Sequence, residues 1–436
     1  MRVFADLYPH FKRNRYICSK MIGSMYKRTV DNWWSFKTAD TKEYTHCYHT
    51  YPAMMIPQVA RALLDKFKPK DGIKLLFDPY MGSGTSLVEA NISGVNAIGT
   101  DLNPLARMMA KVKTTHYNEK LIKEYFSYIQ SQLVFYNESL VKDRDFSRIS
   151  NYFFWYNQED LLKLSYLSQL IKECDNYQEF FNLILSEVVR EVSFTRNSEF
   201  KRYKMSENQL KKFCPDTFRL FETKAIRNIK GLIQFNGIPN SGKSQIYDFN
   251  SVNGIPSNII EEETVDMVIT SPPYGDSHTT VAYGQFSRWS NEWFGFNDAK
   301  HLDNILMGGK KYKNESFQTN SISSELEQIK QIDPKRYQEV ASFLSDYYHS
   351  IANVAKCIRH GGVVCYVVGN RTVKTIQIPL DYFTVETFSK FGFKHIDTIV
   401  REIPNKRMPL KNSPTNEHGK TINTMNNEYI VILQKD

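Results

Sequence analysis

The chain has 436 residues, which is enough for about three domains of ordinary size or one large domain with insertions. Hydrophobic residues make up 41% and charged residues 24%, so wholesale disorder is excluded. The net charge of +9 suits a polyanionic partner. No apolar run reaches about 18 residues, and the six cysteines include no CxxC pair. We therefore expect no membrane span, no metal site and a reducing, cytoplasmic location.

The first part of the chain predicts the start of a parallel sheet. Residues 1–48 are basic and aromatic without firm periodicity, and apolar residues at helical spacing then predict a helix over 54–68. A short buried strand is predicted at 74–77, followed by a Gly-rich turn and a helix that Gly94 closes. A second strand is predicted over 96–100. This strand–turn–helix–strand order is typical of a doubly wound α/β sheet.

Two insertions interrupt the remaining sheet. Residues 115–240 have a mostly helical pattern with few Pro or Gly residues, and we predict one inserted helical subdomain there. A polar, Asn/Ser-rich stretch over 284–339 is predicted to be irregular. Further predicted sheet elements are strands at 245–249, 265–270, 363–370 and 428–433 and a helix around 338–358.

The first motif, Phe-Asp-Pro-Tyr-Met-Gly-Ser-Gly-Thr-Ser, follows the predicted strand at 74–77. Asp78 stands at the carboxyl end of that strand, where open α/β sheets bind ligands, and its charge suits a cation. The glycines let a ligand approach the backbone. Asp101 ends the next strand 19 residues after Gly82, at the place and spacing of an acid that binds ribose hydroxyls. A turn needed only for packing is the alternative, and the two acids at strand ends favour a binding site.

The second motif, Thr-Ser-Pro-Pro-Tyr-Gly, directly follows the predicted strand at 265–270. Pro272 and Pro273 donate no backbone N–H and fix their φ angles, so the carbonyls beside them can act as rigid acceptors. Ser271 adds a polar partner, and Tyr274 offers a flat face. Rigid acceptors beside a stacking ring suit an exocyclic amine on a flat base. A plain Pro-Pro turn is the alternative.

Together these motifs resemble the DNA amino-methyltransferases that use S-adenosyl-L-methionine, and the serine form Ser-Pro-Pro-Tyr resembles their cytosine-N4 branch. The sequence His-Thr-Tyr-Pro-Ala at 49–53 resembles the family's additional cofactor motif. Asp248 stands where the family has a residue near the cofactor's adenine. The resemblance covers roughly 49–114, 241–283 and 340–436, and leaves out both insertions.

The resemblance implies an α/β fold with a doubly wound, mostly parallel, Rossmann-like methyltransferase sheet and a helical insertion. It also implies methyl transfer to N4 of cytosine in double-stranded DNA after base flipping. We expect a monomer, with a cognate restriction endonuclease acting separately. The cofactor-binding residues implied are Tyr51, Pro52, Asp78, Pro79, Gly82, Gly84, Thr85, Asp101 and Asp248, and the catalytic residues are Ser271, Pro272, Pro273 and Tyr274.

Contacts with DNA are expected from the insertions. In the family, this order of motifs often places target recognition in an insertion such as 115–240, and 284–339 could add contacts. Near the end of the helical insertion, a basic stretch is expected to contact phosphates; its candidates are Arg190, Arg196, Lys201 and Arg202. A solvated basic face is the alternative. The aromatic residues over 286–294 indicate either core packing or a wall for the flipped base.

Other functions compete with this interpretation. The same chemistry on N6 of adenine is the nearest rival, and RNA methylation or DNA binding without turnover are further alternatives. Residues 237–244 fit the P-loop pattern letter for letter, with Lys243 as its lysine, and so raise the alternative of an NTPase. A P-loop must follow a strand and open a helix, whereas a strand-like pattern follows here. We therefore interpret this match as a chance loop.

Overall fold

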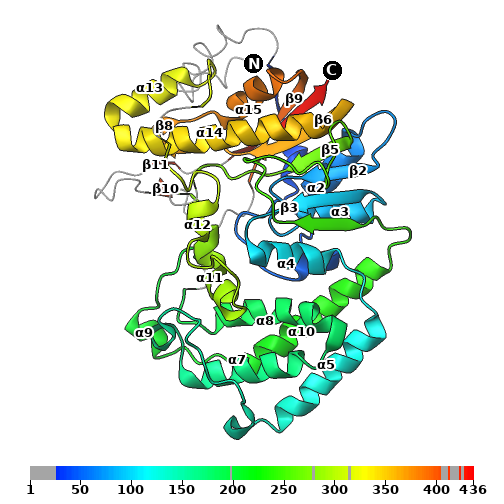
Figure 1. Cartoon of the computed structure of the whole chain (residues 1–436), viewed down its shortest axis with the longest axis vertical. Helices are drawn as coiled ribbons and strands as arrows, with labels where there is room; N and C mark the ends of the chain where they lie inside the picture. The colour runs from blue at the N-terminus through cyan, green and yellow to red at the C-terminus, as the bar shows by residue number, and fades with distance from the viewer. Residues whose placement is uncertain are drawn as a thin grey trace.

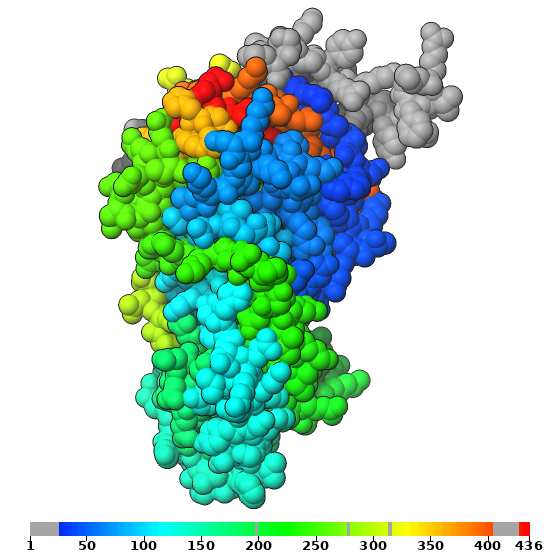
Figure 2. Space-filling view, turned by 90° about the vertical axis from the view of Figure 1, so that its right-hand side faces the viewer, coloured from blue at the N-terminus to red at the C-terminus, as the bar shows by residue number. Residues whose placement is uncertain are grey.

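The computed structural model describes residues 26–196, 199–276, 280–312, 316–403, 411–412, 422–423 and 427–436. The chain forms a sheet flanked by helices and a separate group of helices, which we call the helical lobe (α5 to α10) (Figure 1). Helices α11 and α12 lie between the two parts. A view from the side shows the lobe, in cyan to green, as the narrower lower part of the molecule (Figure 2).

The main sheet has eight strands in the described residues, in the order β1-β9-β12-β6-β5-β2-β3-β4. Every neighbouring pair is parallel except the two pairs that β12 makes with β6 and β9. The expected α/β fold with a doubly wound, mostly parallel, Rossmann-like sheet is therefore confirmed. The strands in chain order are β1 Arg28–Val30, β2 Leu75–Asp78, β3 Asn96–Thr100, β4 Ser244–Tyr247, β5 Val265–Thr270, β6 Ile358–Val368, β9 Phe393–Glu402 and β12 Asn427–Lys435.

Both faces of the sheet are buried, which explains the continuous apolar runs of its central strands. Successive side chains on a strand point to opposite faces. Accordingly, Leu76 and Met267 pack with α2 and α3, while Phe77 and Val268 pack with α14 and α15 on the other face. These helices are α2 Pro57–Lys66, α3 Thr85–Ile92, α14 Pro334–Cys357 and α15 Leu380–Ser389.

The helical lobe has its own hydrophobic core, which extends to α4 and α11. Its helices with α4 and α11 are α4 Pro104–Lys113, α5 Glu119–Val134, α6 Tyr152–Trp155, α7 Gln158–Ile171, α8 Gln178–Glu191, α9 Glu207–Leu210, α10 Thr217–Asn236 and α11 Tyr283–Trp293. The lobe is therefore joined to the rest of the molecule by its packing on α4 and α11 as well as by the covalent connections of the chain. Among the described residues, we find no helix with the length and apolar character needed to cross a bilayer.

The stretch 284–339, expected to be irregular, instead contains most of α11 and all of α12 Leu302–Ile305 and α13 Ser323–Ile332. Trp289 and Trp293 on α11 are 0% and 3% exposed and lie in the core of the lobe. The aromatic residues at these two positions therefore form core, as one of the two interpretations expected. The helix missed from sequence is amphipathic, and its buried face joins the lobe to the cofactor pocket described below.

Two strands of the main sheet were not predicted from the sequence. Within the arm assigned to 1–48, residues 28–30 form β1, an edge strand that pairs with β9. Strand β9 itself mixes charged and apolar residues and lies near the sheet edge. Smaller elements of the described residues are β7 Thr372–Val373, β8 Ile376–Gln377, β10 Lys411–Asn412 and β11 Ile422–Asn423, with 3-10 turns η1 Asn32–Ser35, η2 Tyr44–Cys47, η3 Glu138–Leu140 and η4 Asp175–Tyr177.

The P-loop-like sequence lies between a helix and a strand. Helix α10 ends at Asn236, Gly237 caps it, and β4 begins at Ser244. This order is the reverse of the strand–loop–helix order that lets a P-loop point its amide groups at phosphates. The structural context therefore gives the NTPase alternative no support.

Candidate cofactor and catalytic site

A pocket opens at the carboxyl ends of β2, β3 and β5, with about 1030 Å³ of empty space. The strand order reverses between β2 and β5, and such a reversal is where doubly wound sheets bind ligands. Most of the residues predicted from sequence meet here. Those that line the pocket are Tyr51, Pro52, Asp78, Pro79, Gly82, Thr85, Asp101, Ser271 and Pro273.

Asp78 lies at the floor of this pocket and is 3% exposed. Its Oδ1 accepts hydrogen bonds from the Thr270 hydroxyl at 2.5 Å and from the Tyr80 backbone N–H at 3.0 Å. The Ser86 hydroxyl donates to the other oxygen. Burial raises the pKa of Asp78 to about 6, and these hydrogen bonds oppose the rise. The result is a fixed carboxyl group that a cationic ligand would keep ionised.

Asp101 is the second buried acid of the pocket. Its Oδ2 accepts from the Gly82 backbone N–H at 3.0 Å, and its Oδ1 accepts from the Asn103 backbone N–H at 2.8 Å. Burial raises its pKa to about 6 as well, while these backbone hydrogen bonds lower it. The two carboxyl groups therefore stand at the ends of neighbouring strands, as the motif predicted, with the glycine turn between them.

The two glycines of the turn have different surroundings. Gly82 has φ +48° and lines the pocket, where a Cβ would approach the Tyr51 ring at 3.6 Å. Gly84 has φ +80° and lies behind the lining, where a Cβ would come within 2.9 Å of the backbone of Ala110 on α4. Glycine is therefore needed at position 84 because the turn packs closely on α4.

Aromatic side chains form one wall of the pocket. The ring of Tyr51 stacks on that of Tyr283 at the start of α11, with centroids 5.6 Å apart. The Tyr51 hydroxyl accepts from the Asn103 side-chain amide at 2.9 Å, and the same amide group donates to Ser287 at 2.9 Å. Sequence reasoning missed Tyr283 and Asn103. Asn103 could have been found as the Asn before Pro104 that caps α4 just after Asp101.

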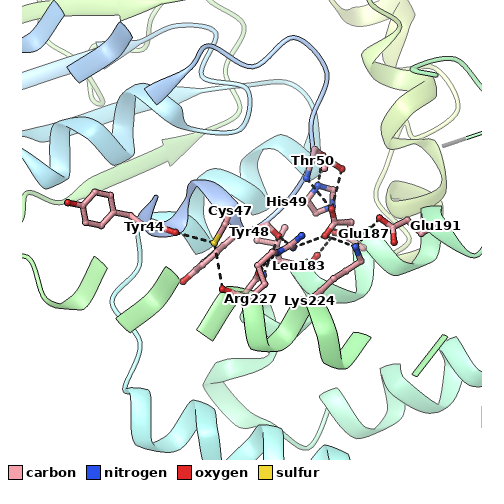
Figure 3. A network of polar contacts seen from close by, with 12 residues as sticks. Tyr44, Cys47, Tyr48, His49, Thr50, Leu183, Glu187, Glu191, Lys224 and Arg227 are labelled. Atoms are coloured by element: carbon pink, nitrogen blue, oxygen red, sulfur yellow. Dashed lines mark hydrogen bonds and ion pairs between the residues drawn. The ribbon is translucent and has the colours of Figure 1, made fainter. Parts of the chain in front are cut away.

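The segment before Tyr51 is held by the helical lobe (Figure 3). Glu187 on α8 accepts from the backbone N–H and the hydroxyl of Thr50 at 3.3 and 3.2 Å, and it pairs with Arg227 at 2.7 Å and Lys224 at 3.3 Å. Burial favours a higher pKa for Glu187, but the charges of His49, Arg227 and Lys224 outweigh it and lower the pKa to about 2. An ionised glutamate of the lobe thus holds Thr50, the neighbour of the pocket residue Tyr51.

The Ser-Pro-Pro-Tyr turn forms the opposite rim. Ser271 and Pro273 line the pocket, whereas Pro272 and Tyr274 lie outside its lining. The Ser271 hydroxyl lies 3.1 Å from the Tyr274 hydroxyl, which donates to Oε1 of Glu428 at 3.1 Å. Burial first, and then Glu428, raises the pKa of Tyr274, so its phenol stays protonated. The sequence analysis expected a stacking face at Tyr274 and had no local signal for Glu428.

Asp248 lies one residue outside the part of the chain that lines the pocket. The lining is made by Phe249 to Val252, directly after β4. The Thr100 hydroxyl donates to the Phe249 carbonyl at 2.6 Å, which fixes this segment against the end of β3. The pocket is thus lined by the residues that directly follow the predicted one.

The basic stretch is less solvated than its sequence indicated. Arg190 is 6% exposed, and its guanidinium donates to the carbonyls of Phe286 at 3.0 Å and Glu199 at 2.7 Å. Arg196 pairs with Glu199 at 3.3 Å. Lys201 and Arg202 are partly exposed. Arg190 therefore ties the lobe to α11 rather than lying on a basic face.

Comparison with known proteins identifies relatives of the chain. No family model matches it. The type II methyltransferase M.BsoBI of Geobacillus stearothermophilus is 23% identical, over 54% of this chain and 50% of its own length. Among solved structures, the rRNA methyltransferase aviRa of Streptomyces viridochromogenes covers 88% of each chain at 10% identity with a TM-score of 0.33. The type II methyltransferase M.MvaI of Kocuria varians is 39% identical, over 95% of this chain and 96% of its own length. The chain therefore belongs to the type II DNA methyltransferases, whose methyl donor is S-adenosyl-L-methionine.

Proposed function

We propose that this chain methylates the exocyclic N4 of cytosine at a specific sequence of double-stranded DNA, as the modification enzyme of a restriction–modification pair. The observation that carries the proposal is Ser271, a neutral hydroxyl at the rim of the pocket that also contains Asp78 and Asp101. Its Ser-Pro-Pro-Tyr setting resembles the cytosine-N4 enzymes. Methylation of adenine N6 is the alternative that the same pocket could perform.

The pocket residues fit S-adenosyl-L-methionine. Buried carboxyl groups beside aromatic and apolar side chains suit a ligand with a cationic part and a flat ring. Asp101, held by the turn at Gly82, would accept from ribose hydroxyls, and Asp78 would face the positive charges of the methionine part. Tyr51, with the segment 249–252, would flank the adenine. When bound, the cofactor supplies a methyl group on a positively charged sulfur.

Ser271 would act on the target amine. The amine is a weak nucleophile because its lone pair is delocalised into the base. Acceptors at the Ser271 hydroxyl and at the carbonyl preceding Pro272 would hold the two amine hydrogens and favour a pyramidal nitrogen. Orientation of the amine toward the methyl group can supply up to roughly 7–11 kcal/mol of the barrier.

A chain of hydroxyl groups leads the amine proton away. Because Tyr274 donates to Glu428, its oxygen is free to accept from Ser271, and the Ser271 oxygen then presents lone pairs to the amine. As the nitrogen gains the methyl group, it releases one proton to Ser271. The Ser271 proton passes to Tyr274, and the Tyr274 proton passes to the Glu428 carboxylate, so charge balances.

Chemical identification of the product tests this proposal. Unmodified duplex DNA is incubated with radiolabelled S-adenosyl-L-methionine and the protein, digested to nucleosides and separated. We expect label only in N4-methylcytosine, and Ser271→Ala should lower the single-turnover rate about tenfold with DNA affinity unchanged. Label in N6-methyladenine would overturn the choice of base. Absence of label in DNA would overturn the function.

Target recognition is proposed to lie in the helical lobe, with 284–339 adding contacts. The lobe packs on α11, which begins at the cofactor pocket with Tyr283. It also carries Lys201 and Arg202 on its partly exposed side. Exchange of 115–240 with the corresponding part of a relative should change the methylated sequence. If specificity follows 284–339 instead, the assignment is wrong.

A further inference from the structure

A second cavity lies on the helical lobe, with about 660 Å³ of empty space. It is lined by Ser150, Asn151, Phe154, Trp155, Arg202 and Arg288. Arg288 belongs to α11, the helix whose first residue, Tyr283, lines the cofactor pocket. Five residues of helix separate them, which is about 7.5 Å along the axis. The two cavities are therefore lined by side chains of the same helix, α11.

Arg202 has an unusual environment in this cavity. Its guanidinium lies over the ring of Trp289 at 4.7 Å and over that of Trp155 at 5.8 Å. Its Nε is buried, and the guanidinium makes no hydrogen bond with any described residue. Burial lowers its pKa. A buried donor without a partner lowers the stability of the protein. Arg202 rests on indole rings and has unused donors, so a ligand that accepts hydrogen bonds would remove this cost.

The neighbouring arginine is different. Arg288 donates to the carboxylate of Glu292, to the Lys300 carbonyl at 3.0 Å and to the Ser150 hydroxyl at 3.3 Å. Its charge and donors are therefore already used within the protein. Of the two arginines that line the cavity, Arg202 is therefore the one that can bind a ligand.

The shape of the site selects the ligand. A guanidinium stacked on a ring presents its edge, which carries two parallel N–H donors. A phosphate would be met by a protruding side chain, whereas this arginine rests on indole rings and faces a cavity whose lining includes Phe154 and Trp155. Phe154, which lines the cavity, is 51% exposed, and Lys204 lies over its ring at 3.6 Å. Exposed aromatic and basic groups beside a recessed donor edge suit nucleic acid.

We propose that Arg202 reads a guanine of the target sequence by hydrogen bonds to its O6 and N7, the commonest specific contact of arginine with DNA. The inference rests on the proposed function. A duplex that contains a target cytosine always contains a guanine, so such a contact is available in any site that this enzyme methylates.

The test uses the full-length protein and a duplex with its methylated sequence, found by modification mapping. Each guanine is replaced in turn by 7-deazaguanine, which lacks the N7 acceptor. Wild type should lose several-fold, and at most about 150-fold, in kcat/KM at one position contacted by Arg202, because this base lacks one of the two acceptors. Arg202→Met, which keeps the apolar stem and removes both contacts, should lose at least that factor on the normal duplex and lose nothing further with 7-deazaguanine at that position.

Lys201→Met is the matched control for loss of a neighbouring charge. It should weaken binding to all sequences and lower the salt slope by about one, as a phosphate contact does. The same behaviour in Arg202→Met would overturn the guanine contact, as would wild-type activity insensitive to 7-deazaguanine at every position. The wild-type measurement needs no variant to fold. If wild type methylates no DNA at all, the proposed function fails instead.

Discussion

The hydroxyl of Tyr274 lies 3.1 Å from Oε1 of Glu428, although 154 positions separate the two residues in the chain. The antiparallel direction of β12 explains the contact, because its start lies at the edge of the sheet where the parallel strands end. Glu428 is paired on its other side with Arg401 of β9 at 3.2 Å. The Ser-Pro-Pro-Tyr turn is thus supported by side chains from the other half of the sheet.

Replacement of Tyr274 by Phe removes the hydroxyl and keeps the ring, so it tests the two roles of this side chain separately. If the hydroxyl passes the proton to Glu428, Tyr274→Phe should lower single-turnover methyl transfer about 10- to 100-fold, the range for a hydrogen bond to a charged group. Tyr274→Ala should lose more, because it also removes the ring. Tyr128→Phe is the control, since that hydroxyl donates to Glu173 in the lobe. A Tyr274→Phe rate equal to wild type would leave only the stacking role.

Asp78→Asn should weaken S-adenosyl-L-methionine binding and flatten its pH dependence. Burial raises the pKa of Asp78 to about 6, so the free wild-type carboxyl gains charge as the pH rises through 6. Affinity for a cationic ligand should therefore rise between pH 5 and 8. Calorimetry at several pH values measures this, with Asp248→Asn as the control just outside the pocket lining. Equal pH curves for wild type and Asp78→Asn would contradict the assignment.

The same substitution should stabilise the protein at high pH. The folded-state pKa of about 6 exceeds the ordinary value of 3.8, so the folded state binds the proton more tightly. Stability is therefore lost as the pH rises from about 4 to 6, by about 3 kcal/mol in total. The free energy of unfolding of Asp78→Asn minus that of wild type should be about 1–2 kcal/mol more positive at pH 7.5 than at pH 5. Urea titrations check this, and a difference of opposite sign would contradict it.

Glu187→Gln should destabilise the junction of lobe and sheet by about 3 kcal/mol, because Arg227 loses its buried carboxylate partner while Lys224 keeps Glu191 at 2.9 Å. The pKa of Glu187 is lowered to about 2 from 4.5, so its contribution is present above pH 4.5 and lost as the pH falls toward 2. Glu179→Gln, in an exposed pair with Lys111, should cost less than about 1 kcal/mol. Thermal unfolding measures both variants, and equal melting temperatures would show that Glu187 does not stabilise the junction.

Lys243→Ala should leave methyl transfer unchanged and independent of ATP. The loop that carries Lys243 precedes β4 instead of opening a helix. Its backbone amide groups therefore do not form a helix N-terminus, which is the part of a P-loop that binds phosphates. A sensitive assay of ATP hydrolysis on the purified protein accompanies the methyl-transfer assay. Hydrolysis that disappears in the variant would establish a nucleotide site here.

The sequence predicts the parts of the site that are local. Asp78 and Asp101 could be predicted because each ends a buried strand, and Ser271 because two prolines mark its turn. Strand β1 has three residues, too few for a pattern. Glu428 could not be predicted, because its contact with Tyr274 depends on the order of strands. The burial of Arg190 depends likewise on where α11 packs.

Strand β12 has a consequence for how the chain is made. It lies between β6 and β9, and Ile430 to Leu433 are fully buried. It follows every other strand that the structure describes, so during synthesis the sheet first forms without it and leaves two long, unpaired strand edges at its place. Until the strand enters, Tyr274 also lacks Glu428. Newly made molecules are therefore vulnerable to aggregation and lack the proposed proton acceptor. A truncation before Asn427 would remove an inner strand of the sheet rather than an edge strand.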